Sequence, residues 1–245
     1  MRRGLRKREV AVSTLSGPKS RRLLDDLILL EHDDPGGREA GMSTNAYVLI
    51  SDGKSLLMDV SYEHLLLLVR AVAGEGYPPA GLLLSHRHLA GNGDVFGTFE
   101  EEFDAPIFLH PLDTEHPQAK SAGVEFRNPM ENTLFEEFGA EVMHFPGQTE
   151  GSVMLYRERD GLLLSGDSAM GPTNPQTAGG MERLIRPPLF TSVDDEGLRR
   201  NWMRFDRSVV HFGPLHGSVY MNRADRMEEI MHPLVREEPT QGVEG

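Results

Sequence analysis

Hydrophobic and polar positions alternate along the chain in short blocks, and turn residues separate one block from the next. Apolar runs of roughly 4–8 residues with such boundaries are typical of strands, and the fully apolar ones are typical of strands buried between layers. The predicted strands are residues 23–34, 42–60, 80–85, 105–110, 140–145, 152–156, 162–167 and 208–217. The second of these divides at Asp52-Gly53, a dipeptide that favours a hairpin turn.

Other segments show a helical pattern. The clearest is residues 61–77, where leucines and valine cover a broad face before Gly74 and Gly76 end the helix. The other predicted helices are residues 93–103, residues 193–206, which open with a capping box from Ser192 to Asp195, and residues 223–235. Helices interleaved with apolar strands predict an α/β fold. We expect Trp202, the only tryptophan, to pack the 193–206 helix onto a sheet.

Two segments resist assignment. Residues 111–134 contain Pro and Gly without a clear period, and residues 171–190 form a long irregular stretch. Long irregular loops inside compact domains are often functional lids. We therefore expect both segments to shape substrate specificity, although the sequence does not reveal the substrate.

Charge is distributed unevenly along the 245 residues. Residues 1–22 hold eight basic residues and one acid, a net charge of +7, whereas the rest holds 17 basic and 37 acidic residues, a net charge of −20. We expect a solvated or disordered basic arm over residues 1–22, a single domain over 23–237 and a tail over 238–245.

The composition limits the classes of molecule that this protein is expected to bind. An acidic body disfavours broad contact with nucleic-acid phosphates. No apolar run approaches a membrane span, and the basic N-terminus lacks the apolar core of a secretory signal. The absence of cysteine excludes disulfides and cysteine-ligated zinc. We expect a soluble, cytoplasmic protein with a small-molecule ligand of unknown identity, and a homo-oligomer stays open.

The residues that could bind a metal or take part in catalysis lie where the predicted apolar strands end. The pentapeptide "GLLLS" occurs at 81–85 and again at 161–165, and each copy leads into a candidate ligand, His86 in the first and Asp167 in the second. His86 and His88 lie two residues apart, so in an extended chain both side chains would point to one side and converge on one ion. His216 and Gln148 lie in glycine-containing turns beside other predicted strands. Polar residues at strand ends are typical of active sites in α/β folds.

These motifs, "SHRHLAG", "PGQTEGS", "LLLSGDS" and "PLHGS", follow one another in the order typical of one family. The sequence from about residue 23 to 220 resembles the metallo-β-lactamase superfamily. The resemblance implies a four-layer αββα sandwich with the site at one edge between the two sheets. It also implies the family's metal motifs, namely H-x-H-x-D-H, a P-G-H turn, a strand ending in G-D and a late histidine turn.

The resemblance implies which residues are metal ligands and shows where this sequence departs from the family's ligand pattern. The family's first metal is held by the H-x-H pair, here His86 and His88, and by the histidine of the P-G-H turn, where this chain has Gln148. Asp167 matches the aspartate that bridges both metals, and His216 matches the late ligand of the second metal. The other two second-metal ligands are lost, because their positions hold Ala90 and Gly91, which cannot ligate.

The departures leave three hypotheses open. The first is a catalytically reduced protein that keeps the fold for binding or assembly. The second is a mononuclear hydrolase of an ester, thioester, amide or phosphoester, with one zinc or iron ion held by His86, His88 and Asp167. His216 would then approach as a fourth ligand, and Asp167 or His216 would assist proton transfer. The third is a mononuclear iron oxidoreductase.

Three further histidines lie near the motifs. His110 and His144 fall within predicted strands, where packing or hydrogen bonding is the more common role for a histidine. His144 could replace the lost ligand of the P-G-H turn if its strand points it inward. His116 lies in the unassigned 111–134 segment and could swing toward the site.

Overall fold

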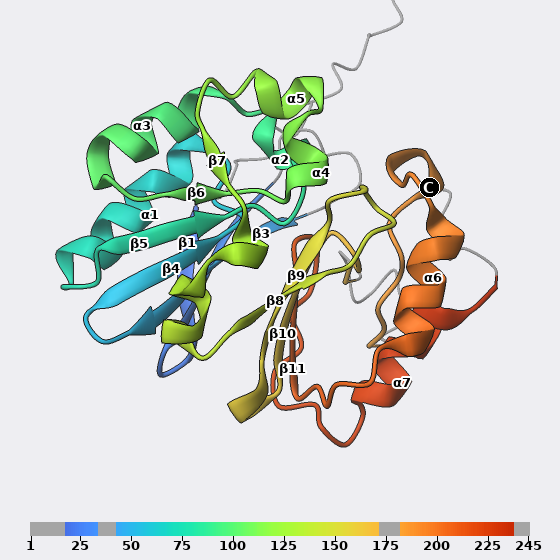
Figure 1. Cartoon of the computed structure of the whole chain (residues 1–245). Helices are drawn as coiled ribbons and strands as arrows, with labels where there is room; N and C mark the ends of the chain where they lie inside the picture. The colour runs from blue at the N-terminus through green and yellow to red at the C-terminus, as the bar shows by residue number, and fades with distance from the viewer. Residues whose placement is uncertain (1–17, 34–42, 172–181, 238–245) are drawn as a thin grey trace, which may run out of the picture.

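The computed structural model describes residues 18–33, 43–171 and 182–237. They form two sheets that lie between two sets of helices (Figure 1). The seven-stranded sheet has the order β1 (Lys19–Leu24), β2 (Leu27–Asp33), β3 (Ser43–Ser51), β4 (Lys54–Met58), β5 (Pro79–Leu83), β6 (Ile107–Phe108) and β7 (Phe126–Arg127). The four-stranded sheet has the order β11 (His211–Pro214), β10 (Leu162–Gly166), β9 (Val153–Arg157) and β8 (Glu141–His144).

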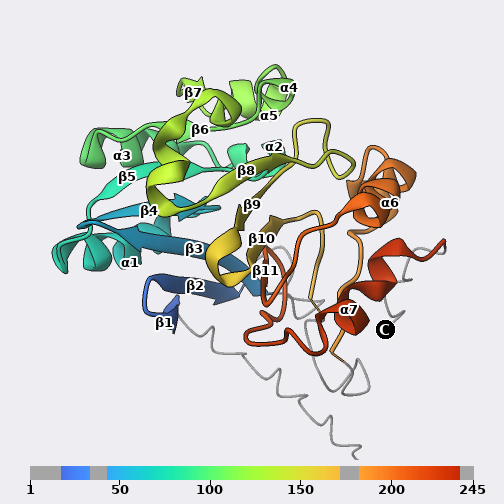
Figure 2. The same cartoon turned by 60° about the horizontal axis from the view of Figure 1, so that its bottom comes forward.

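Helices cover the outer face of each sheet, α1 and α3 on the first and α6 and α7 on the second, as the two views show (Figures 1 and 2). The α-helices are α1 (Glu63–Gly74), α2 (Arg87–Ala90), α3 (Asp94–Phe103), α4 (Pro111–Thr114), α5 (Pro117–Lys120), α6 (Asp195–Arg204) and α7 (Met227–Met231). Short 3₁₀ helices are η2 (Pro129–Glu131), η3 (Thr133–Phe138), η4 (Glu158–Asp160), η5 (Leu189–Thr191) and η6 (His232–Val235).

Three apolar cores lie between these four layers. The first sheet buries Leu57 and Leu82 against α1 and α3, while the neighbouring residues Leu56 and Leu83 face the second sheet. Successive side chains of a strand point to opposite faces, so a strand buried on both faces is apolar throughout. The third core lies between the second sheet and α6 and α7, and it includes Trp202. The predicted four-layer αββα sandwich is confirmed, and so is the predicted packing of Trp202.

Strand direction brings particular loops to one edge. The pairs β4–β5 and β10–β11 are parallel, so their C-terminal ends point the same way within each sheet. The loops that follow these strands hold Asp59, His86, Asp167 and His216. The predicted clustering of strand ends is therefore built into the sheet topology.

The N-terminal region differs from the prediction. The prediction of one strand over residues 23–34 is wrong at its start, because residues 19–33 form a hairpin in which β1 and β2 turn at residues 25–26 and Lys19 pairs with Glu31. Residues 19–22 of the predicted basic arm thus belong to an edge strand, where exposed Lys and Arg side chains are tolerated. The remainder of the arm, residues 1–17, and the tail 238–245 lie outside the described residues.

Helix boundaries also differ from the prediction. Helix α6 is capped by Asp194, whose side chain accepts a hydrogen bond from the Gly197 amide at 2.8 Å, and Ser192 is not the cap. The predicted 223–235 helix is divided into α7 and η6 near Pro233, which cannot donate a backbone hydrogen bond. The unassigned residues 111–134 form short helices, 3₁₀ turns and the edge strand β7, and residues 172–181 of the predicted loop are not described. No helix of the described residues is long and apolar enough to cross a membrane.

Candidate functional site

The loops after β5 and β10 meet at the predicted edge. The Val153 amide donates to the Ser85 carbonyl at 2.9 Å, and the Leu215 amide donates to the Gly166 carbonyl at 2.9 Å. Contact between Ser85 and Gly166 is so close that a Cβ on the glycine would lie 2.3 Å from the Ser85 Cβ. These contacts bring the residues that follow, His86 and Asp167, into one region.

His86 and His88 do not share one extended segment. His86 has extended dihedrals (φ −167°, ψ 165°), but the chain then turns into α2, which contains His88. Their rings lie edge to face, with centroids 5.1 Å apart. His86 is buried, and its Nδ1 lies 3.0 Å from the Ser85 hydroxyl. The extended conformation assumed for this segment thus ends at His86, although the two rings still lie close together.

Both imidazoles are disfavoured as cations. Burial lowers the pKa of His86 well below its usual value, and the neighbouring His88 and His216 lower it further. Burial also lowers the pKa of His88, and the Arg87 guanidinium adds to that effect. The two rings are thus neutral at physiological pH and can accept hydrogen bonds.

Gln148 connects these loops through its side-chain amide. It is fully buried, and its Nε2 lies 2.9 Å from His88 Nδ1, 3.4 Å from Asp167 Oδ2 and 3.3 Å from the Thr191 carbonyl. The Ser152 hydroxyl donates to its Oε1 at 3.4 Å. We call His88, Gln148, Asp167 and Thr191 the Gln148 cluster.

Asp167 and His216 interact electrostatically in this region. Burial raises the pKa of Asp167 to about 6, and the charge of His216 opposes that rise. Oδ1 of Asp167 is buried and has no hydrogen-bond partner among the described residues. Nδ1 of His216 lies 3.4 Å from both the Thr44 hydroxyl and the Ser43 carbonyl, so this nitrogen is directed at the start of β3.

The two substituted positions of the first motif supply no side chain to the site. Ala90 is fully buried in the core between the first sheet and its helices, and Gly91 follows α2 at the surface. Within residues 18–33, 43–171 and 182–237, no group of three His, Asp or Glu side chains is placed to hold a metal ion. The role of His86, His88, Asp167 and His216 as ligands stays a prediction.

A buried ion-pair network, which the sequence analysis missed, supports the site from behind. Asp113 pairs with the Arg87 guanidinium at 2.8 Å and accepts from the Arg87 amide at 2.9 Å. It also accepts from the Thr149 hydroxyl at 2.7 Å and the Gly151 amide at 3.1 Å. Arg87 forms a second ion pair with Glu150. The network thus fastens the H-R-H segment to the P-G-Q turn, and its one sequence signal is the lone arginine between the two histidines that follow a buried strand.

Asp59 is a second missed residue. It is fully buried and has φ of +62°, an uncommon conformation for a residue other than glycine, and its Oδ1 accepts from the Ser85 amide at 2.7 Å. Burial raises its pKa to about 7, although the hydrogen bonds from Ser85 act in the opposite direction. The stretch "SLLMD" has the same strand-then-aspartate pattern as "LLLSGD", and that pattern could have identified it.

The raised pKa of Asp59 predicts a pH-dependent stability. The folded protein holds the Asp59 proton more tightly than the unfolded chain, so this contribution is fully present below the usual pKa of 3.8 and is lost as the pH rises toward 7. The free energy of unfolding should fall by about 2 kcal/mol between about pH 5 and pH 7 relative to an Asp59→Asn variant. Urea titrations of both proteins test this, and parallel pH profiles would contradict it.

The other histidines near the motifs do not join the cluster. His110 caps α4 by accepting from the Leu112 amide and stacks on His144 with ring centroids 4.2 Å apart. The Nε2 of His144 lies 2.8 Å from the Glu150 carbonyl, so His144 does not replace the missing ligand. His116 caps α5 by accepting from the Gln118 amide. All three are hydrogen-bonded residues of the rim.

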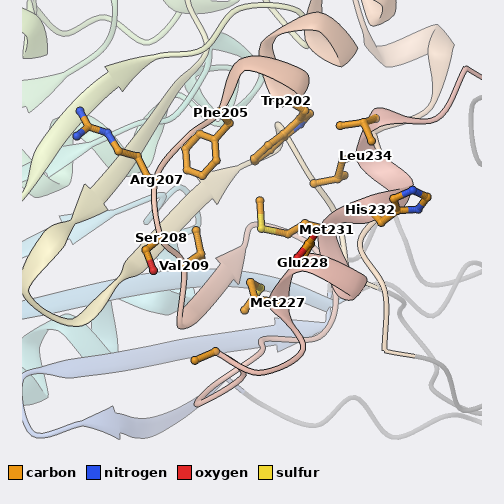
Figure 3. Close-up of a pocket in the computed structure, with 12 residues that line it drawn as sticks. Trp202, Phe205, Arg207, Ser208, Val209, Met227, Glu228, Met231, His232 and Leu234 are labelled. Atoms are coloured by element: carbon orange, nitrogen blue, oxygen red, sulfur yellow. The ribbon is translucent and has the colours of Figure 1, made fainter.

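A separate cavity of about 410 Å³ lies between α6, α7 and η6 (Figure 3). Trp202, Phe205, Met227 and Met231 give it an apolar lining, and none of the predicted site residues borders it. Trp202 connects it to the site, because its indole N–H donates to the Ser168 carbonyl at 3.0 Å, next to Asp167.

Comparison with known sequences identifies the fold's relatives. The sequence profile described as the metallo-beta-lactamase superfamily matches residues 40–213, which is more than half of the chain. The chain belongs to the metallo-β-lactamase superfamily. The resemblance seen in the four motifs is therefore confirmed.

Individual members of the superfamily show the same relationship. The "Probable metallo-hydrolase YqgX" of Bacillus subtilis is 28% identical over 142 residues, which cover 51% of this chain and 66%, just under two thirds, of that protein. The metallo-β-lactamase FIM-1 from Pseudomonas aeruginosa, solved in a mono-zinc form, is 10% identical, with a TM-score of 0.64 over 90% of this chain and 94% of that one. TTHA1623, solved in a di-iron-bound form, is 24% identical, with a TM-score of 0.54 over 74% of this chain and 91% of that one. At these identities the solved structures show a shared fold.

Members of the superfamily bind zinc or iron, and the residues present here do not fit a dinuclear centre. Zinc and iron sites in proteins need several basic nitrogen or anionic oxygen ligands. Gln148 presents an N–H donor to His88 and Asp167, and positions 90 and 91 present no ligand. Asp167 Oδ1, which is buried and has no hydrogen-bond partner among the described residues, would suit a single cation.

Proposed function

We propose that this metallo-β-lactamase-fold protein is catalytically reduced and that it keeps the fold to bind a ligand or a partner. The placement of positions 90 and 91 carries the proposal. Ala90 lies within the helix-side core and Gly91 lies at the surface, so only Asp167 and His216 remain of the ligands for a second ion. The His216 Nδ1 is directed at Ser43 and Thr44. A second ion would therefore have too few ligands.

The site that remains suits hydrogen bonding. Its imidazoles, His86 and His88, have lowered pKa values and are neutral, and its buried carboxyl, Asp167, has a raised pKa. Such groups donate and accept hydrogen bonds, which suits recognition of a polar small molecule.

One observation favours a second candidate, a mononuclear metal-dependent hydrolase. Oδ1 of Asp167 is buried and accepts no hydrogen bond from the described residues, as expected for a carboxylate oxygen that a cation would satisfy. His86 and His88 would be the other ligands.

Elemental analysis separates the two candidates. We expect the full chain, purified without added metal and dialysed against excess zinc, to hold far less than one zinc, iron or manganese ion per chain. A His86→Ala variant, treated identically, should give the same low value. Wild type should also hydrolyse ester, thioester, amide and phosphodiester reporter substrates no faster than the variant does.

Stoichiometric metal in the wild type that disappears in His86→Ala would overturn the proposal. That result would favour the mononuclear hydrolase instead, and a matching loss of reporter hydrolysis would identify its reaction class.

A further inference from the structure

The buried amide of Gln148 faces acceptor atoms on three sides. Its Nε2 lies 2.9 Å from His88 Nδ1, 3.3 Å from the Thr191 carbonyl and 3.4 Å from Asp167 Oδ2. A primary amide nitrogen has two N–H groups and donates hydrogen bonds only. The lone pairs of these acceptors thus converge on a point of partial positive charge, as they would around a cation.

The network determines which way the amide is oriented. If its two ends were exchanged, the carbonyl oxygen would face Asp167 Oδ2 and the Thr191 carbonyl, and neither a carboxylate nor a carbonyl oxygen can donate. In the observed orientation the Ser152 hydroxyl donates to Oε1 at 3.4 Å. Nδ1 of His88 is therefore the acceptor of this contact, and its ring proton resides on Nε2.

We infer that the Gln148 amide takes the place of the first metal ion of this fold, as an internal hydrogen-bond donor that joins His88, Asp167 and Thr191 without metal. This inference rests on the proposed function, because it explains how a site that has lost the second ion also dispenses with the first.

The amide joins segments that are distant in the sequence. His88 comes from α2, Asp167 from the loop after β10 and Thr191 from η5. The Gln148 backbone continues the connection, because its carbonyl accepts from the Val193 amide at 3.1 Å just before α6. A metal ion would have to displace the amide from His88 Nδ1 and Asp167 Oδ2 before it could bind, and Gln148 would offer it only a neutral, weakly basic oxygen in return.

Restoring an imidazole at position 148 tests this inference. We expect Gln148→His to bind about one Co²⁺ per chain, with the visible absorption of a tetrahedral ion, because three histidines and Asp167 would then be available. Gln148→Ala removes the amide and adds no ligand, so it should bind Co²⁺ more weakly than Gln148→His. Wild type should bind least. The double variant His86→Ala with Gln148→His is the matched control and should lose the bound ion.

A measurement on the wild type keeps the test decisive if a variant fails to fold. Nitrogen-15 NMR of the His88 ring should show a protonated Nε2 and a hydrogen-bonded, unprotonated Nδ1. A protonated Nδ1 would overturn the inference.

The metal titration distinguishes the two proposals. Co²⁺ bound by wild type as tightly as by Gln148→His would overturn both this inference and the proposed function. If a folded Gln148→His variant binds no more Co²⁺ than Gln148→Ala does, the inference alone is wrong, and the proposed function stands.

Discussion

Replacing Asp113 by alanine is expected to lower the free energy of unfolding by about 5 kcal/mol, because a buried ion pair would lose one partner. The Arg87 side chain is 8% exposed and that of Asp113 is fully buried, so the guanidinium would lose its buried partner and keep only Glu150, whose side chain is 56% exposed. Thr149 and Gly151 would lose their acceptor at the same time. Urea or guanidinium denaturation measures the change.

Two comparisons test whether the loss of stability comes from the buried ion pair. Arg70 and Glu102 form a bidentate pair at the surface, and a Glu102→Ala variant should cost less than about 1 kcal/mol. Adding Arg87→Met to Asp113→Ala should recover part of the loss, because the double variant contains no unpaired buried charge. If Asp113→Ala costs no more than Glu102→Ala, the network does not hold the two loops together.

Replacing Gly166 by alanine should be the second severe change, with a cost of about 3–5 kcal/mol. Gly166 has φ of +53°, and a Cβ there would lie 2.3 Å from the Ser85 Cβ and 2.5 Å from its Oγ. The alanine would thus combine left-handed backbone strain with a collision against the loop that leads to His86. Denaturation followed by the fluorescence of Trp202, the only tryptophan, measures the loss.

Gly53 provides a matched control for the cost of left-handed backbone strain alone. It has φ of +72°, and nothing lies within 4 Å of the position that a Cβ would take. Gly53→Ala should therefore cost only the left-handed strain, about 1 kcal/mol. Equal losses for the two alanine variants would show that the close approach of Gly166 to Ser85 contributes little.

Tight contacts between strand ends support the polar site. Three segments are held together by an ion pair, an amide hydrogen bond and a close glycine contact. They are the loop after β5, the turn before β9 and the loop after β10. The proposed loss of metal is compatible with an ordered site, because Asp113 and Gln148 provide the cross-links that a metal ion would otherwise contribute.

The hydrophobic pattern predicted the parts of the fold that depend on burial. Leu56 and Leu57 point to opposite faces of β4 and are both fully buried, so an unbroken apolar run was a sound signal for a strand between two layers. Asp52-Gly53 marked its hairpin for a similarly local reason. Local signals were weaker at helix ends, where Asp194 and not Ser192 caps α6.

Which polar residues follow the buried strands can be read from the sequence alone, and the order of the motifs reveals which of them depart from the family. The sequence could not determine their partners, because Arg87 and Asp113 are 26 residues apart and His88 and Gln148 are 60 apart. The direction of the Gln148 amide toward His88 and Asp167 is evident only in the folded protein. Hydrophobic burial is encoded residue by residue along the chain, whereas a hydrogen bond depends on distance and direction between loops that packing alone brings together.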